Sequence, residues 1–426
     1  MSFNTLGLSA KLLHALSDKG YTLPTPVQEQ VIPAILARRD ILAAAQTGTG
    51  KTAGFTLPIL QLLNDETAQR DTRRVRALIL TPTRELAIQV GASVAEYGKY
   101  LPLNSAVVYG GASAGVQIRR FKEGIDTLIA TPGRLLDHIR KKNVDLSSVE
   151  FLVLDEADRM LDMGFIGDIR EIISQLPAKR QNLLFSATFS PEIRKLAGGI
   201  LQKPAQVEIS ARNSSPEEVK HEIHLVNKED KQAHLAYIIG SRRWEQVLVF
   251  TRTRKEADHL GKQMKLDGLP TAVIHGEKTQ GARARALEGF KEGTVRVLVA
   301  TDIAARGLDI DKLPHVVNFD LPLVAEDYLH RIGRTGRAGN EGTALSLVSR
   351  EEFGLLKDIE KLIKRTIPQV ETHEAWSEPL QKSKAKKASK PGAYHRSKTP
   401  KRRSQTAGKK SSAPKQKSRP PHSGKR

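Results

Sequence analysis

Eight residues near the start of the chain combine glycine, threonine and lysine in an order suited to binding phosphate. They are AQTGTGKT, residues 45–52, and they lie between an apolar run and a helical pattern. Glycines allow a phosphate to approach closely, and amide groups at a helix start point toward anions. Lys51 would neutralise phosphate charge, and the Thr52 hydroxyl would reach Mg²⁺. The segment therefore predicts a nucleotide-phosphate site rather than a simple glycine turn, with these residues as its wall: Gln46, Thr47, Gly48, Thr49, Gly50, Lys51 and Thr52.

A group of carboxylates, DEAD at residues 155–158, follows the apolar run Phe151–Leu154. In α/β proteins, ligands bind at the carboxyl ends of such strands. Asp155 suits Mg²⁺ coordination, and Glu156 suits orienting or deprotonating an attacking water, which are the tasks that phosphoryl transfer leaves to carboxylates. On an exposed helix the same residues would form only a solvated face. Their place after a strand, downstream of a phosphate loop, favours the catalytic interpretation.

Short apolar runs that alternate with helical patterns would position these groups. This alternation predicts parallel sheets covered by helices. The first series of expected strands is Ile41–Ala45, Ala77–Leu80, Thr127–Ala130, Phe151–Leu154 and Asn182–Phe185. The second series is Gln246–Thr251, Thr271–Ile274, Val295–Ala300, His315–Phe319 and Gly342–Val348. The chain is therefore expected to carry two α/β domains in tandem.

Composition places the domain boundaries. The polar stretch that ends at Pro216 suits a linker, so we expect domains at residues 1–209 and 218–372 joined by residues 210–217. Helical and strand periodicity stops after about Glu371, and residues 373–426 cannot bury a core and should be disordered. From Gln381 to Arg426 there are 17 Lys or Arg and no acid, which leaves about +4 of the formal +21 for the rest. The excess positive charge therefore lies in the C-terminal tail.

Several classes of protein and site are excluded or disfavoured. The chain has no cysteine, which removes disulfides, thiolate metal sites and thiol nucleophiles and fits a reducing compartment. No run of some eighteen apolar residues or signal-like start occurs. The expectation is a soluble cytoplasmic protein that does not enter a membrane, and its basic charge suggests a polyanionic partner.

These motifs, in this order, resemble those of the DEAD-box ATP-dependent RNA helicases, most closely the bacterial RhlE type. The resemblance runs from about Phe3 to Pro368. It implies two RecA-like domains that use ATP and Mg²⁺, with RNA-stimulated hydrolysis gated by closure of the two domains. It also implies local unwinding of short RNA duplexes or remodelling of RNA–protein complexes.

The resemblance assigns adenine recognition to residues 20–28, GYTLPTPVQ, with Phe3 at the expected upstream distance. Gln28 would recognise adenine, because a side-chain amide both donates and accepts. Tyr21 would stack on the base, and Thr25 would support the site. Without the family, a proline-rich helix start with a solvated Gln28 would be the preferred interpretation.

Three further motifs acquire roles only through the resemblance. Ser186 and Thr188 of the SAT triplet would couple the ATP site to strand separation through hydrogen bonds to Asp158. His330 is also expected to have a coupling role. In HRIGRTGR, residues 330–337, Arg334 and Arg337 would act as arginine fingers, whereas a basic surface loop is the plain alternative. Asp309 would accept hydrogen bonds from the ribose.

RNA contacts are also implied by the family. In the first domain they are Pro82, Thr83, Arg84, Gly110, Gly111, Thr131, Pro132, Gly133 and Arg134; in the second they are Arg283, Thr301 and Asp302. Hydroxyls, arginines and exposed amides hold phosphates and sugars, so binding should not depend on base sequence. The tail would tether RNA electrostatically, although a solubilising role or an acidic protein partner is also compatible.

Two rival functions stay open at this point. A DNA helicase or translocase would use the same paired domains, and an ATP-locked RNA clamp could carry the same catalytic residues. Ribosomal precursors and RNA-decay complexes are both compatible partners.

Overall fold

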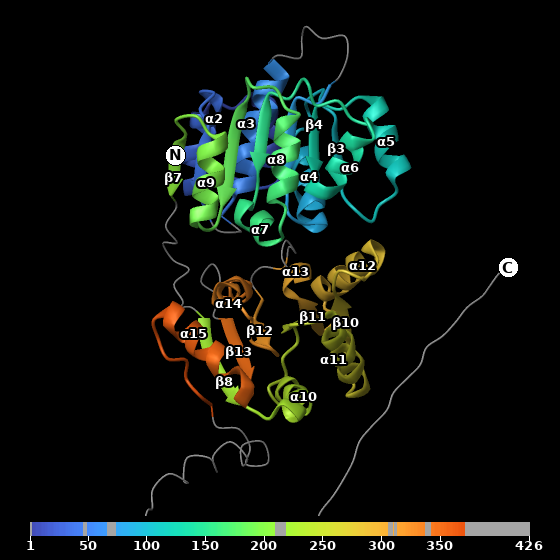
Figure 1. The fold of residues 1–426 in the computed structure, drawn as a ribbon, viewed down its shortest axis with the longest axis vertical. Coiled ribbons are helices and arrows are strands. Elements are labelled where there is room, and N and C mark those ends of the chain that lie inside the picture. Colours follow the sequence, from blue (N-terminus) through green and yellow to red (C-terminus); the bar gives the residue numbers. More distant parts are fainter. Residues whose placement is uncertain are drawn as a thin grey trace, which may run out of the picture. The chain divides into compact units, whose positions relative to one another are not determined.

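The computed structural model of the chain describes residues 2–45, 49–65, 74–208, 219–305, 310, 313–336 and 342–370. The chain forms two parallel sheets flanked by helices, one from residues before the expected linker in sequence and one from residues after it (Figure 1). We call the described residues 2–208 the first lobe and 219–370 the second lobe. The predicted fold class, two RecA-like α/β domains, is confirmed.

Among the described residues, the first lobe forms a seven-stranded sheet in the order β3-β4-β2-β5-β6-β1-β7. Its strands are β1 (Ile41–Ala44), β2 (Ala77–Leu80), β3 (Ser105–Val108), β4 (Thr127–Ala130), β5 (Phe151–Leu154), β6 (Gln181–Ser186) and β7 (Ala205–Glu208). Its helices are η1 (Phe3–Leu6), α1 (Ala10–Asp18), α2 (Pro26–Leu36), α3 (Lys51–Asp65), α4 (Arg84–Tyr97), α5 (Ala114–Glu123), α6 (Pro132–Arg140), α7 (Ala157–Asp162), α8 (Ile166–Ser174) and α9 (Pro191–Ile200).

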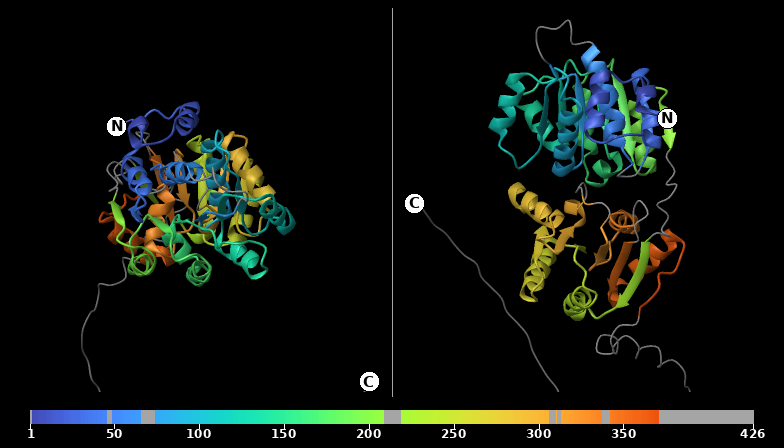
Figure 2. Two further views of the ribbon diagram at one scale, coloured as in Figure 1. Left: turned by 90° about the horizontal axis from the view of Figure 1, so that it is seen from above. Right: turned by 180° about the vertical axis from the view of Figure 1, so that it is seen from behind.

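Helices cover both faces of this sheet, which is why its central strands are apolar throughout. One apolar cluster joins the face of Ala77 and Ile79 to α1–α4, and the other joins the face of Leu78 and Leu80 to α6–α9. Figure 1 looks onto α8 and α9, and the view from behind in Figure 2 shows the helices of the opposite face. Burial on both faces fixes the strand register, so the strand ends that carry the motifs are held rigidly.

The described part of the second lobe forms a six-stranded parallel sheet in the order β10-β11-β9-β12-β13-β8. Its strands are β8 (Val219–Leu225), β9 (Val247–Thr251), β10 (Thr271–Ile274), β11 (Val297–Thr301), β12 (His315–Asn318) and β13 (Gly342–Val348). Its helices are η4 (Lys228–Asp230), α10 (Lys231–Ser241), α11 (Arg254–Leu266), α12 (Gln280–Lys291), α13 (Asp302–Ala305), α14 (Ala325–Ile332), η5 (Arg350–Glu352) and α15 (Phe353–Ile363). Helices α10 and α11 pack on one face, and α12–α15 pack on the other.

All ten expected strands are present, with ends that differ by up to two residues. Three strands were not expected. Strand β3 is only four residues long, β7 is an edge strand whose Gln206 and Glu208 are exposed, and β8 alternates His221, Glu222 and His224 with apolar residues. Strand β8 was not predicted because its buried polar side chains interrupt the apolar run that marks a buried strand.

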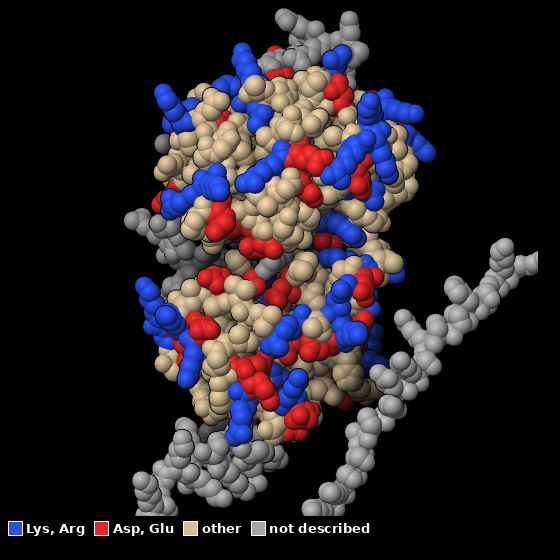
Figure 3. Space-filling view, in the orientation of Figure 1, with Lys and Arg blue, Asp and Glu red and all other residues tan. Residues whose placement is uncertain are grey.

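The remaining expectations concern membrane crossing, surface charge, the linker and the tail. Among the described residues, every helix is too short or too polar to cross a lipid bilayer. Lysine and arginine are interspersed with aspartate and glutamate on the face of each lobe that Figure 3 shows. The expected linker 210–217 and the tail 373–426 lie outside the described residues.

Candidate functional site

The described end of the phosphate loop begins helix α3. Lys51, which is buried, donates from Nζ to the carbonyl oxygen of Ala45 at 2.8 Å. This bond joins the two ends of the loop on either side of Gln46, Thr47 and Gly48, which lie outside the described residues. A phosphate that approached the loop would offer Lys51 a charged partner in place of a neutral carbonyl.

Gln28 and Thr25 contact this loop directly. Thr25 donates from Oγ1 to the carbonyl oxygen of Thr49 at 2.8 Å, and Gln28 donates from Nε2 to that of Gly50 at 3.0 Å. Gln28 Oε1 also accepts from the Thr25 amide at 2.9 Å, which caps α2. A Cβ at Gly50, whose φ is +89°, would lie 2.5 Å from Gln28 Nε2, so only glycine fits. The structure thus brings these predicted residues together at the loop.

Asp155 is a buried carboxylate at the carboxyl end of β5. Its Oδ1 has no hydrogen-bond partner among the described residues. Burial raises the pKa of Asp155 to about 6; the Lys51 charge opposes this shift, and Glu156 adds to it. An unpartnered buried oxygen beside a phosphate-loop lysine fits a divalent cation, since Mg²⁺ is typically held by one or two carboxylates together with phosphates.

Glu156 adopts a backbone conformation that is rare for a residue with a side chain. Its φ and ψ are 55° and 52°, where it precedes the first turn of α7. Its Oε2 lies 3.1 Å from Arg159 Nη1, and both side chains are buried. Left-handed non-glycine residues often mark functional sites, because the surrounding structure must offset their strain.

Asp158 connects α7 to the strand end after β6. Its Oδ2 accepts from the amides of Ala187 and Thr188 at 3.0 and 2.9 Å, and from Thr188 Oγ1 at 3.2 Å. The expected contact with the SAT triplet is therefore present for Thr188. The Ser186 hydroxyl instead donates to the Thr188 carbonyl at 2.8 Å, which supports the turn without touching Asp158.

The predicted RNA contacts of the first lobe follow three adjacent strands, β3, β4 and β2. Thr83 caps α4, and Thr131 precedes α6. A Cβ at Gly111, whose φ is +84°, would lie 2.5 Å from Arg84 Nη1, so the glycine pair leaves room for this guanidinium.

The edge of the first sheet is thereby divided. Segments that follow β3, β4 and β2 carry the predicted RNA contacts, whereas those that follow β1, β5 and β6 carry the phosphate loop, DEAD and SAT. Tyr21 lies near Tyr97, with 6.4 Å between ring centroids, and it is about half exposed. An exposed ring remains able to stack on a base.

The second lobe repeats this division. Thr301 ends β11, Asp302 begins α13, and Arg283 on α12 donates from Nη2 to the Ala304 carbonyl at 3.4 Å. Arg334 follows α14, on the far side of β9 in the sheet order, and is buried. His330 Nδ1 lies 3.6 Å from Asp327. The predicted Asp309 and Arg337 lie outside the described residues.

One residue of this edge was not assigned from the sequence. Arg331 donates from Nε and Nη2 to both carboxylate oxygens of Asp302, at 2.6 and 2.7 Å. Its place three residues before Arg334 was visible in the sequence, but its partner 29 residues upstream was not. Asp302 is thus a structural partner of Arg331 in addition to being a predicted RNA contact.

Comparison with known proteins places these motifs in a family. The DEAD/DEAH box helicase model matches residues 25–196, and the helicase conserved C-terminal domain model matches residues 230–339. The DEAD-box ATP-dependent RNA helicase RhpA of Helicobacter pylori is 41% identical over 362 residues, which cover 85% of this chain and 72% of RhpA. This chain belongs to the DEAD-box ATP-dependent RNA helicases.

Further relatives agree with this assignment. The DEAD-box helicase CshA of Bacillus subtilis is 40% identical over 365 residues, covering 86% of this chain and 73% of CshA. Among solved structures, S. cerevisiae Dbp5 bound to RNA and ADP BeF3 matches with a TM-score of 0.76 and 32% identity, over 90% of this chain and 98% of Dbp5. Mss116p bound to ssRNA and AMP-PNP matches with a TM-score of 0.77 and 29% identity, over 89% of this chain and 82% of that one. As a DEAD-box helicase, the chain is an RNA-stimulated ATPase that uses ATP.

Proposed function

We propose that this DEAD-box helicase hydrolyses ATP at a site divided between its lobes and thereby opens short RNA duplexes locally, in the manner of the bacterial RhlE type. The observation that carries the proposal is the matching division of both sheet edges. In the first lobe, one half of the edge carries residues suited to nucleotide and the other half carries residues suited to RNA. Among the described residues of the second lobe, the predicted RNA contacts follow β10 and β11, and Arg334 follows β12. Closure of the lobes would bring the nucleotide residues of one lobe to those of the other, and the RNA contacts of one lobe to those of the other. RNA binding and hydrolysis would therefore depend on the same movement.

In the first lobe, Lys51 and Thr52 would hold phosphate oxygens and Mg²⁺. Asp155, with its unpartnered Oδ1, would help to hold the metal ion. A metal ion held there would supply positive charge that offsets the charge of the phosphates. Glu156 would orient the attacking water and accept its proton, and Gln28 would recognise adenine beside the loop to which it is hydrogen-bonded.

In the second lobe, Arg334 and Arg337 would supply permanent positive charge to the γ-phosphate as it is transferred. Asp309 would hold the ribose. Neither lobe alone would then have both the nucleotide grip and the charge that stabilises the transition state. Hydrolysis would await closure.

RNA would be held through its backbone by Thr83, Arg84 and Arg134 in the first lobe and by Arg283 and Thr301 in the second, with the other predicted contacts. These groups suit phosphates and 2′-hydroxyls rather than base edges. Dbp5 and Mss116p were both solved with RNA, which supports an RNA strand as the substrate here. Ribosomal precursors or RNA-decay complexes in the cytoplasm are the physiological substrates we favour.

Replacing Arg334 with lysine tests the division of the ATP site. Arg334→Lys keeps the charge but removes the forked guanidinium, so we expect RNA-stimulated phosphate release to fall by about 1000-fold while nucleotide affinity changes little. Arg350→Lys, an exposed arginine of the same lobe, is the matched control. Release within a few-fold of wild type in Arg334→Lys would refute the role of this residue.

The nature of the strand is tested separately. Matched RNA and DNA single strands should differ in ATPase stimulation, with RNA the stronger, because 2′-hydroxyl contacts distinguish the two. A strand-displacement assay on a short RNA duplex then separates an unwinding enzyme from an ATP-locked clamp. Equal stimulation by DNA, or ATP-dependent binding without displacement, would overturn the corresponding part of the proposal.

A further inference from the structure

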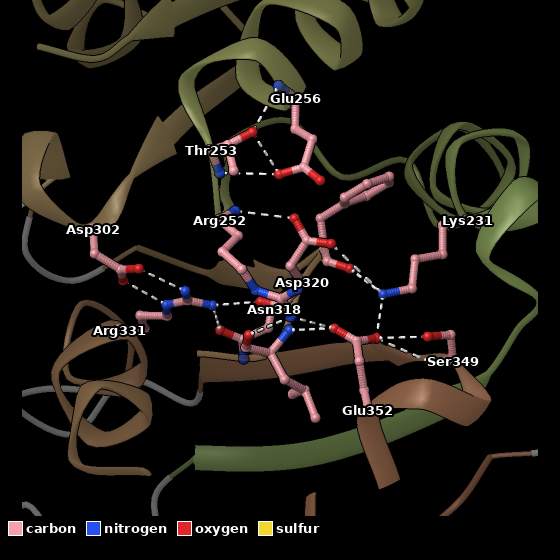
Figure 4. A network of polar contacts seen from close by, with 12 residues as sticks. Lys231, Arg252, Thr253, Glu256, Asp302, Asn318, Asp320, Arg331, Ser349 and Glu352 are labelled. Carbon is pink, nitrogen blue, oxygen red and sulfur yellow. Dashed lines mark hydrogen bonds and ion pairs between the residues drawn. The ribbon is translucent and has the colours of Figure 1, made fainter. Parts of the chain in front are cut away.

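A series of alternating charges runs along the carboxyl edge of the second sheet (Figure 4). It joins the segments that follow five neighbouring strands, β11, β9, β12, β13 and β8. Its basic members are Lys231, Arg252 and Arg331, and its acidic members are Asp302, Asp320 and Glu352. Lys231, Arg331, Asp320 and Glu352 are buried, whereas Arg252 and Asp302 are partly exposed at the rim of the network. Three positive and three negative charges balance, which permits the burial of the inner members.

Arg331 forms one end of this network. Besides its paired bonds to Asp302, it donates from Nη1 to the Asp320 carbonyl at 2.6 Å and to Asn318 Oδ1 at 3.1 Å. The side chain is 1% exposed. A guanidinium held on four acceptors has one available orientation. Arg331 therefore fixes α14, which leads to Arg334, relative to the start of α13.

Glu352 forms the other end. Its Oε2 accepts from Lys231 Nζ at 2.5 Å, and its Oε1 accepts from the Leu321 amide at 3.0 Å and from Arg252 Nη2 at 3.1 Å. Lys231 also donates to the Phe319 carbonyl at 2.7 Å. Glu352 thereby contacts Leu321 directly and Phe319 through Lys231, so it holds the segment before and after Asp320.

The two ends meet at Asp320. Its carbonyl accepts from Arg331, and its carboxylate accepts from the Arg252 amide at 3.0 Å. Burial raises the pKa of Asp320. Burial alone would also raise the pKa of Glu352, but Lys231 and the other donors outweigh it and lower that pKa. Glu352 is the carboxylate that accepts from both Lys231 and Arg252.

We propose that Glu352 is a positioning residue that sets the arginine finger and the RNA contacts of the second lobe relative to each other. It acts through residues 319–321 on Arg331, and through Arg331 on Asp302 and on the helix that precedes Arg334. Glu352 lies beyond the stretch that the helicase C-terminal model matches, residues 230–339. This inference rests on the proposed roles of Thr301, Asp302 and Arg334.

The test is Glu352→Gln in the full chain. The amide keeps the shape but leaves Lys231 and Arg252 without their shared anion, so the 319–321 segment should shift. We expect kcat with saturating RNA to fall about tenfold and the RNA concentration for half-maximal activity to rise several-fold. The KM for ATP should stay within about twofold, because the first lobe holds the nucleotide. Glu351→Gln, the exposed neighbour on η5, is the matched control and should match wild type.

Assays well below the melting temperature separate positioning from loss of folded protein. A purely structural defect would lower kcat through the folded fraction and leave the half-maximal RNA concentration unchanged. That result, or wild-type kinetics, would overturn the inference.

A double-mutant cycle with Asp302→Asn tests the route. If Glu352 acts through Arg331 and Asp302, the double variant should be little worse than Asp302→Asn alone, whereas additive losses would contradict the proposed route. The Arg334→Lys variant separates the positioning role of Glu352 from the proposed function. If that variant is inactive and Glu352→Gln is normal, only the positioning role fails; if Arg334→Lys is active, the proposed function fails.

Discussion

The carboxyl edges of the two sheets differ in how their charges are satisfied. In the first lobe, Asp155 Oδ1 has no hydrogen-bond partner among the described residues, and Lys51 is bonded to a neutral carbonyl of its own loop. In the second lobe, Arg331 and Glu352 are buried within a balanced network. The first edge is therefore suited to exchanging partners when a ligand binds, whereas the second is already organised.

This contrast gives the lobes different tasks. A site that must capture and release nucleotide needs groups whose best partner is the ligand. A site that stabilises a transition state needs groups that do not rearrange during the reaction. We therefore interpret the first lobe as the half that captures nucleotide and supplies Glu156, and the second as the half whose charges are organised before a ligand binds. Four predictions test this interpretation.

The largest effect is expected at Glu156. Glu156→Gln removes the base that activates water, so RNA-stimulated ATP hydrolysis should fall by about 100-fold or more while ATP binding persists. The variant should remain on RNA as a long-lived ATP complex, measurable by gel shift. Glu171→Gln, an exposed glutamate on α8 paired with Arg140, is the control and should hydrolyse normally. Rapid turnover by Glu156→Gln would remove this residue from its role.

A smaller effect is expected at the link between Asp158 and Thr188. Thr188→Val removes one of three donors to Asp158 Oδ2 and keeps the two amides. Loss of one hydrogen bond to a buried carboxylate should reduce duplex displacement by about tenfold. ATP hydrolysis should change less. Ser174→Ala, an exposed serine on α8, is the control, and equal losses of both activities would argue against a coupling role.

The two lobes should also differ in their response to acid. Burial, aided by Arg242, lowers the pKa of His224, His234 and His315 to about 4. Below pH 6.5 the unfolded chain takes up protons that these folded histidines refuse. Stability of the second lobe should therefore fall as the pH is lowered from 6.5 toward 4 and be fully present above 6.5.

Calorimetry of the full chain at pH 7.5 and pH 5 checks this. The transition of the second lobe should move down by several degrees more than that of the first. His315→Asn should reduce the acid sensitivity, and His259→Asn, at an exposed position of the same lobe, should not. Equal shifts of the two transitions would contradict the prediction.

The smallest effect concerns the basic tail, which lies outside the described residues. Truncation after Thr372 removes the 17 positive charges and should weaken RNA affinity a few-fold at low salt. Maximal turnover should be unchanged. Unchanged affinity at low salt would rule out tethering by the tail.

Much of the fold could be predicted because buried parallel strands are continuous apolar runs. Phe151–Leu154 and Gly342–Val348 were placed with their observed ends. Strand β8 was missed because His221, Glu222 and His224 are buried by pairing with distant groups, such as Tyr328 for His221 and Arg242 for Glu222. Hydropathy does not record such pairing.

The candidate site shows the same limit. Motif spacing indicated Lys51 and Asp155, since their roles depend on neighbours within one strand–loop–helix unit, whereas Thr188 was indicated only by the family resemblance. Motif spacing did not indicate that Lys51 is bonded to Ala45, or that Glu352 contacts residues 100 positions or more away in sequence. Long-range polar partners are set by how the chain packs, so only the structure reveals them.

The division of the ATP site between lobes is tested most directly with the first lobe alone. Residues 1–209 should bind ATP yet hydrolyse it at a slow rate that RNA does not change, whereas the full chain with RNA should be faster by about 1000-fold, the contribution expected of an arginine finger. If the isolated first lobe hydrolysed ATP as fast as the full chain, with or without RNA, the divided site would be refuted.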